Sequence, residues 1–153
     1  MGELHFPKEF FEPEEREGFY VPEMMKRAWE AELEVLNAVR KVCYDNGLRY
    51  FACGGTLLGA IRHKGYIPWD DDIDVYMLRD EYDKFLEIAP GALPEGLVLS
   101  GTYAADQRLF EANDMPQARV IADETIFSIP TLMTNFHGFP YMRVGVDIFP
   151  YDY

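Results

Sequence analysis

Between Gly54 and Val75 the chain carries a glycine-rich turn, a short cationic stretch and then four aspartates within five positions, Asp70 to Asp74. Carboxylates crowded in this way repel one another and raise each other's pKa, so the cluster is either fully solvated or neutralised by a cation. Apolar residues that usually bury precede the cluster, at 67–69, and alternate with its last members. This setting disfavours a solvated acidic turn, and the sequence favours a bound divalent metal ion.

The residues from 72 to 77 have the two-residue period of a half-buried β-strand, because apolar side chains occupy every second position. Side chains two positions apart on a strand point to the same face, with Cα atoms about 6.5 Å apart. Asp72 and Asp74 therefore direct two carboxylates to one place, as a hard cation such as Mg²⁺ requires. A calcium loop of the EF-hand type is disfavoured, since its glycine and distal glutamate are missing.

The composition narrows the class of protein. A chain of 153 residues with 48% apolar and 15% aromatic residues is long enough for one domain with a packed core. Its net charge of −13 argues against nucleic acid and anionic membrane as partners. The sequence contains neither an apolar stretch of membrane-spanning length nor a secretory leader pattern. Cys43 and Cys53 lack metal or redox spacing, so we expect reduced thiols in a cytoplasmic protein.

The chain divides into an expected N-terminal arm, residues 1–20, and one domain, residues 21–153. The clearest element is an amphipathic helix that opens at Val21-Pro22-Glu23 and stops at Asn46-Gly47. Further helices are expected over 56–61 and 81–88, strands over 50–53, 72–77, 97–99, 118–121, 125–127 and 144–149, and a loop or ragged hairpin over 130–143.

The order of helix, strand, glycine turn, short helix, acidic strand and later Val-Asp-Ile strand resembles the nucleotidyltransferase fold shared with DNA polymerase β. The resemblance implies an α+β fold with a mixed central sheet flanked by helices. It also implies that backbone N–H groups at Gly54, Gly55 and Thr56 bind nucleotide phosphates, as a helix N-terminus can. A third carboxylate is expected on a neighbouring strand. Asp147 is the candidate because apolar residues flank it, the alternative being an outward-facing side chain on a half-exposed strand.

Several motifs resemble the signature of a narrower group, the LicD family, which includes bacterial phosphocholine transferases and fukutin-type ribitol-phosphate transferases. The motifs are GTLLGA at 55–60, RHKG at 62–65, IPWDDDID at 67–74, RDEY at 79–82 and VDIFP at 146–150. The resemblance implies transfer of a phospho-alcohol group, phosphocholine-like, from a CDP-activated donor such as CDP-choline to a sugar hydroxyl. The acceptor would be a cell-surface glycan, and CMP would be released.

The same resemblance implies two Mg²⁺ or Mn²⁺ ions held by Asp72, Asp74 and Asp147, with Asp147 able to accept the proton of the attacking hydroxyl. Arg62 and Lys64 are candidates for phosphate contacts, and simple charge balancing of the aspartates is an equal alternative. Arg119 and Arg143 are weaker candidates on nearby strands, and Trp69 is expected in the core or at the rim of the acidic loop.

Two other functions are compatible with the motifs: transfer of a nucleoside monophosphate by the same metal site, and a non-catalytic fragment or binding domain. Family members usually continue with helical sequence beyond the last motif. We therefore expect this domain to be C-terminally incomplete. On that basis the apolar face of the last strand should be open to solvent or covered by another chain.

Overall fold

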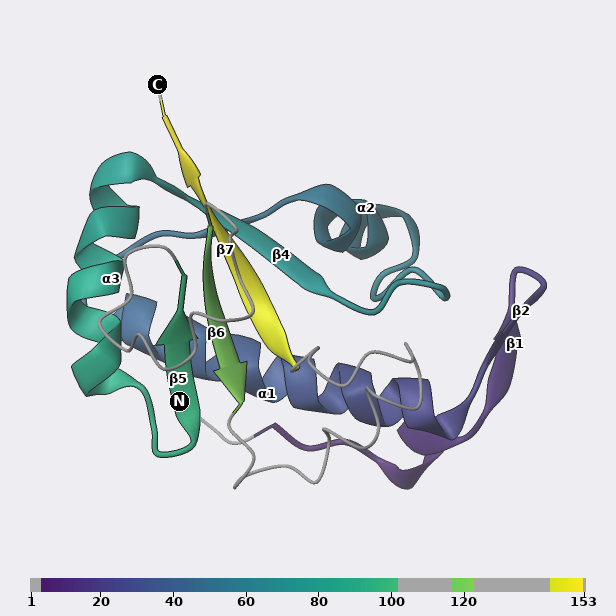
Figure 1. Cartoon of the computed structure of the whole chain (residues 1–153). Helices are drawn as coiled ribbons and strands as arrows, with labels where there is room; N and C mark the ends of the chain where they lie inside the picture. The colour runs from purple at the N-terminus through teal and green to yellow at the C-terminus, as the bar shows by residue number, and fades with distance from the viewer. Residues whose placement is uncertain (1–3, 102–116, 123–143, 153) are drawn as a thin grey trace.

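The computed structural model describes residues 4–101, 117–122 and 144–152, and a five-stranded mixed sheet lies at its centre (Figure 1). The strand order is β3-β4-β7-β6-β5. Among the described strands, β4 and β7 are the only parallel neighbours, and the other pairs are antiparallel. The strands are β3 (Phe51–Ala52), β4 (Ile73–Leu78), β5 (Leu97–Ser100), β6 (Ala118–Ala122) and β7 (Gly145–Tyr151). The predicted α+β class with a mixed sheet and flanking helices is confirmed.

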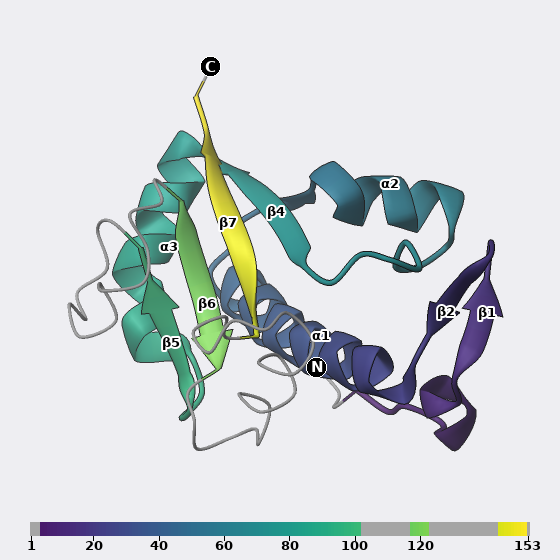
Figure 2. The same cartoon turned by 45° about the vertical axis from the view of Figure 1, so that its right-hand side comes forward.

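Two helices, α1 (Glu23–Asp45) and α3 (Arg79–Ala92), cover one face of this sheet (Figure 2). The alternating apolar residues of β4, β6 and β7 pack against them and form the main core. The helix α1 begins after Pro22 and ends at Asn46, before Gly47 in the left-handed region (φ +65°), as predicted. The helix α3 is longer than expected. It continues past Pro90, because a proline in the last turn removes only one helical hydrogen bond.

The third helix, α2 (Gly54–Arg62), lies beside β4 and follows directly from β3. The N-terminal segment, expected as an extended arm, contains short regular elements that we did not predict. A 3₁₀ turn, η1 (Lys8–Phe11), precedes a hairpin of β1 (Glu14–Arg16) and β2 (Phe19–Val21). Figure 1 shows this hairpin beyond the N-terminal end of α1.

The expectation that the apolar face of the last strand is exposed is wrong. Val146 and Ile148 of β7 are fully buried, because the preceding helices α1 and α3 already cover that face. The strand also runs through Pro150 to Tyr151, beyond its predicted end. Pro150 is tolerated there since β6 pairs with β7 only as far as Ile148. The elements predicted at 125–127 and 130–143 lie outside the described residues.

None of the described helices has the length and apolar character needed to cross a membrane.

Candidate metal and phosphate site

The central feature of the site is a row of charged residues on the sheet face opposite α1 and α3. Because β4 and β7 are parallel and in register, Asp74 lies directly opposite Asp147. The next strand, β6, places Arg119 opposite Asp147 from the other side. All three alternate along their strands with buried apolar residues, so they share the face that the core does not use. The predicted convergence of Asp74 and Asp147 is thus present in the structure.

Burial and mutual repulsion make the carboxylates of this row unusual. Nε of Arg119 lies 3.1 Å from Oδ1 of Asp147, and the two side chains are only 15% and 16% exposed. Burial raises the pKa of Asp147, and the charge of Arg119 opposes that rise. Burial, followed by the negative charges of Asp72 and Asp147, raises the pKa of Asp74 to about 6. The row therefore contains more negative charge than Arg119 offsets.

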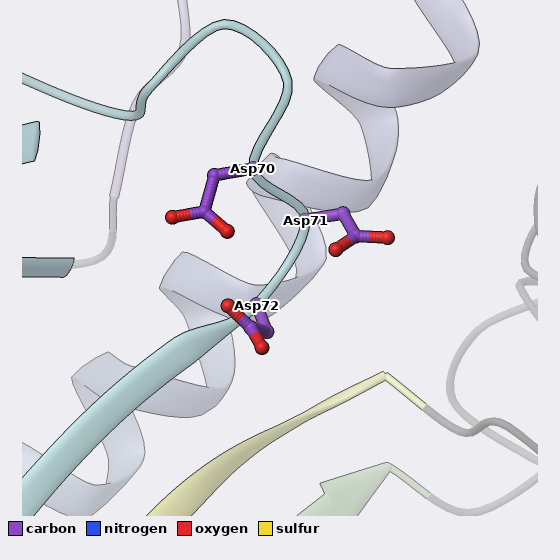
Figure 3. A group of neighbouring side chains, drawn as sticks. All are labelled: Asp70, Asp71 and Asp72. Atoms are coloured by element: carbon purple, nitrogen blue, oxygen red, sulfur yellow. The ribbon is translucent and has the colours of Figure 1, made fainter. Parts of the chain in front are cut away.

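Three more aspartates form an acidic turn, Asp70–Asp72, immediately before β4 (Figure 3). Each offers one carboxylate oxygen, and these three oxygens lie within 4.8 Å of one another. Burial, with the nearby charge of Asp72, raises the pKa of Asp70 to about 6. Asp72 was predicted in the strand but belongs to the turn before it. Its charge nevertheless contributes to the raised pKa of both Asp74 and Asp147. The sequence pattern left the direction of Asp70 open, and no periodic signal could have supplied it.

The glycine turn at the start of α2 lies directly against these carboxylates. Gly54 has a positive φ of +52°, and a Cβ built on it would lie 3.1 Å from Oδ2 of Asp74. A Cβ on Gly55 would overlap Oδ2 of Asp70. The Thr56 hydroxyl oxygen accepts a hydrogen bond of 2.8 Å from the backbone N–H of Asp74. The predicted phosphate turn and the acidic residues are therefore one continuous site.

The predicted cations Arg62 and Lys64 lie at the other end of α2. A helix of nine residues is about 13 Å long, so this end is well separated from the glycine turn. Nε of Arg62 donates to Nδ1 of His63 at 3.3 Å, and Nζ of Lys64 donates to the carbonyl oxygen of Ile61 at 2.9 Å. Nε2 of His63 lies 3.2 Å from Oε2 of Glu17. The phosphate role of these two cations stays a prediction.

A cavity of about 330 Å³ nevertheless brings Lys64 to the same pocket as Gly55, Thr56 and Asp70. Trp69 is 51% exposed and packs edge-on near the rings of Phe19 and His63, which places it at the rim rather than in the core. Within the described ranges, a cation that forms an ion pair with one of these carboxylates is Arg119, which the sequence marked only weakly. Arg143 lies outside the described residues.

The donor set fits a hard divalent cation. It consists of carboxylate oxygens, which Mg²⁺ and Mn²⁺ prefer. Burial and then the repulsion of neighbouring aspartates raise the pKa of Asp74 and Asp70, and such an ion would relieve that repulsion. The predicted ligands Asp72, Asp74 and Asp147 lie close enough for their charges to interact, and Asp70 stands beside Gly55 at the edge of the same group. That these side chains hold an ion stays a prediction.

The pKa of Asp74 leads to a prediction on stability. Between about pH 4 and pH 6 the folded protein binds the Asp74 proton more tightly than the unfolded chain does, so without metal the free energy of unfolding falls as pH rises through this window. Asp74→Asn removes the effect. We expect equal melting temperatures of wild type and variant near pH 4, and a more stable variant at pH 7.5, in thermal melts with EDTA. Glu87→Gln on the exposed side of α3 is the control. A difference independent of pH would contradict the account.

Comparison with known proteins places this site in a family. Residues 47–153 match the family model described as LicD/FKTN/FKRP, nucleotidyltransferase domain. Over 56 residues the chain is 55% identical to the lipopolysaccharide cholinephosphotransferase LicD of Haemophilus influenzae, a stretch that is 37% of this chain and 21% of that protein. Over 59 residues it is 42% identical to the ribitol 5-phosphate transferase FKRP of Mus musculus, 39% of this chain and 11% of that protein. The matched stretches thus span about a fifth or less of these relatives.

Proposed function

The chain belongs to the LicD/FKTN/FKRP family of nucleotidyltransferase domains, and we propose that it transfers a phospho-alcohol group from a CDP-activated alcohol to a sugar hydroxyl of a glycan, releasing CMP. The observation that carries the proposal is the in-register pair Asp74 and Asp147 beside the glycine turn of α2. A polymerase-β-like fold is part of the proposal and rests on the order of elements. The names of the two relatives support the proposed reaction, since they describe transfer of cholinephosphate and of ribitol 5-phosphate.

The negative charge of this site is the reason it needs a cation to act on a diphosphate. A nucleoside diphosphate brought to the N-terminus of α2 would meet the carboxylates of Asp70 and Asp74, which repel it. Asp72, Asp74 and Asp147 would hold divalent ions, either Mg²⁺ or Mn²⁺. By analogy with the polymerase-β-like fold, two such ions would bind. When bound, such ions lower the pKa of an attacking hydroxyl and neutralise charge on the leaving oxygen. Phosphoryl transfer depends mainly on this neutralisation and on positioning.

The residues of the chain then have distinct tasks. Backbone N–H groups at Gly55 and Thr56 bind the diphosphate at the helix N-terminus. The acceptor oxygen attacks the phosphorus that carries the alcohol. The bond to the CMP phosphate breaks, and CMP leaves with the electron pair. Asp147 accepts the hydroxyl proton, because burial gives its carboxylate a raised pKa. Arg119 holds Asp147 in place through their 3.1 Å ion pair.

Product analysis tests the reaction type. CDP-choline labelled separately in its choline and cytidine parts would be incubated with Mg²⁺, the protein and a lipopolysaccharide or other glycan acceptor. We expect choline label on the acceptor and cytidine label in free CMP. Cytidine label on the acceptor would replace the proposal with nucleotidyl transfer. Absence of any product with several CDP-alcohols and acceptors would contradict enzymatic function and favour a binding domain.

A further inference from the structure

We propose that Trp29 and Glu32 of helix α1, together with Tyr66, are positioning residues that hold the acidic turn Asp70–Asp72 against the glycine turn. The proposal rests on the proposed function in that the acidic turn is taken as part of the metal and phosphate site. Trp29 and Glu32 lie before residue 47, where the family match begins, whereas Tyr66 and the acidic turn lie within it.

Two hydrogen bonds tie the segment before β4 to α1. The indole Nε1–H of Trp29 donates to the backbone carbonyl oxygen of Asp70 at 2.8 Å. The hydroxyl of Tyr66 donates to Oε2 of Glu32 at 2.9 Å. Between these bonds the rings of Trp29 and Tyr66 stack face to face, with centroids 4.7 Å apart and planes 7° from parallel. The segment is therefore fixed at both Tyr66 and Asp70, and Figure 3 shows the acidic turn beside a helix.

These contacts cost more free energy than apolar packing alone would require. Trp29 and Glu32 are each 2% exposed. Burial raises the pKa of Glu32 well above its usual range; the Tyr66 hydrogen bond opposes this rise, and the charges of Asp71 and Asp72 add to it. A buried carboxyl costs more free energy than an apolar side chain of similar size, unless hydrogen bonds compensate for its lost solvation. An apolar pair would cover the loop but would leave its direction unspecified.

The direction of the turn matters because Asp70 has little room. Its Oδ2 occupies the space that a Cβ on Gly55 would take, so a small shift of the turn changes the contact between the carboxylate and the glycine turn. The bond from Trp29 acts on the backbone of Asp70 itself, two residues from Asp72. Displacement of a metal ligand by about 1 Å is enough to weaken a site that depends on preorganised geometry.

Two substitutions that retain an aromatic ring test the proposal. Trp29→Phe and Tyr66→Phe each keep a ring for stacking and remove one hydrogen bond. We expect each to accelerate amide hydrogen exchange over residues 66–72, to weaken Mn²⁺ affinity in calorimetry about tenfold, and to lower kcat more than KM changes. Exchange in β5 and β6 should not change. Tyr44→Phe, at an exposed tyrosine of the same helix, is the matched control and should leave all three readouts within twofold.

Conservative rescue separates positioning from packing. Glu32→Gln retains an oxygen acceptor for the Tyr66 hydroxyl and should keep the wild-type exchange rate and Mn²⁺ affinity. Glu32→Leu removes the acceptor and should show faster exchange and weaker Mn²⁺ binding. A lower melting temperature with unchanged exchange and affinity would overturn the proposal and make the contacts purely structural. If the wild type binds no Mn²⁺, the proposed function fails, and hydrogen exchange alone decides: unchanged exchange over 66–72 in Tyr66→Phe would overturn the positioning role as well.

Discussion

Asp147→Asn is expected to lower kcat for phospho-alcohol transfer by about 10³-fold or more, while the protein stays folded. The loss follows from the place of this carboxylate opposite Asp74, since a neutral amide can neither accept the hydroxyl proton nor contribute the charge that holds a cation. Several kcal/mol of transition-state stabilisation correspond to a rate change of this size. Steady-state kinetics with the labelled CDP-alcohol, beside a thermal melt, measures both parts.

The matched control is Asp152→Asn, five positions further along. Asp152 is exposed and forms hydrogen bonds of 2.7 and 3.1 Å with Arg79, away from the charged row, so its replacement should change kcat less than twofold. If Asp147→Asn retained a tenth or more of wild-type activity, Asp147 would be an ordinary strand residue paired with Arg119, and the third carboxylate would lie elsewhere.

Gly55→Ala is expected to reduce kcat/KM by about 10- to 100-fold with little change in melting temperature. Its added methyl group meets the flexible end of a side chain, the Oδ2 atom of Asp70, rather than backbone. The carboxylate therefore moves and the fold does not. The methyl group also obstructs close approach of a diphosphate to the start of α2. Binding of CDP and of Mn²⁺, each followed by calorimetry, should weaken together, because one contact serves both.

Gly91→Ala in α3 is the control for this substitution. Nothing lies within 4 Å of a Cβ at Gly91, and its φ is not positive, so alanine there should leave binding unchanged and slightly stabilise the helix. A collapse of the melting temperature in Gly55→Ala, with unchanged affinity per folded molecule, would instead show that the glycine serves only the fold.

Local sequence patterns predicted the strands that carry the site but not all of the contacts between them. The alternation around Asp74 and around Asp147 was enough to predict both strands, because side-chain period and burial are local properties. Their pairing in parallel register joins residues 73 positions apart in the sequence, and no local signal predicts it. The resemblance implied only that the third carboxylate lies on a neighbouring strand. For Trp69 the sequence left the core and the rim as alternatives, because one of its ring neighbours, Phe19, comes from the N-terminal hairpin, whose formation was not predicted.

The direction of the acidic turn could not be predicted at all. Asp70 points at Gly55 while Trp29 donates to its backbone carbonyl, and the periodic pattern of α1 marks Trp29 only as a buried position. An indole N–H that satisfies a loop carbonyl leaves no trace in hydrophobic periodicity. The same holds for Arg119, which is one basic residue in an apolar strand until β6 and β7 pair and bring it to Asp147.

Calorimetric titration with Mn²⁺ tests whether Asp72, Asp74 and Asp147 hold a divalent cation. Wild-type protein should bind the ion above pH 6 and lose affinity below that pH, as the raised pKa of Asp74 requires. The Asp72→Asn/Asp74→Asn double variant should show no measurable binding and should remain folded. Wild-type affinity in the double variant would contradict the account, because the ion would then be held by other residues and the charged row would not be the metal site.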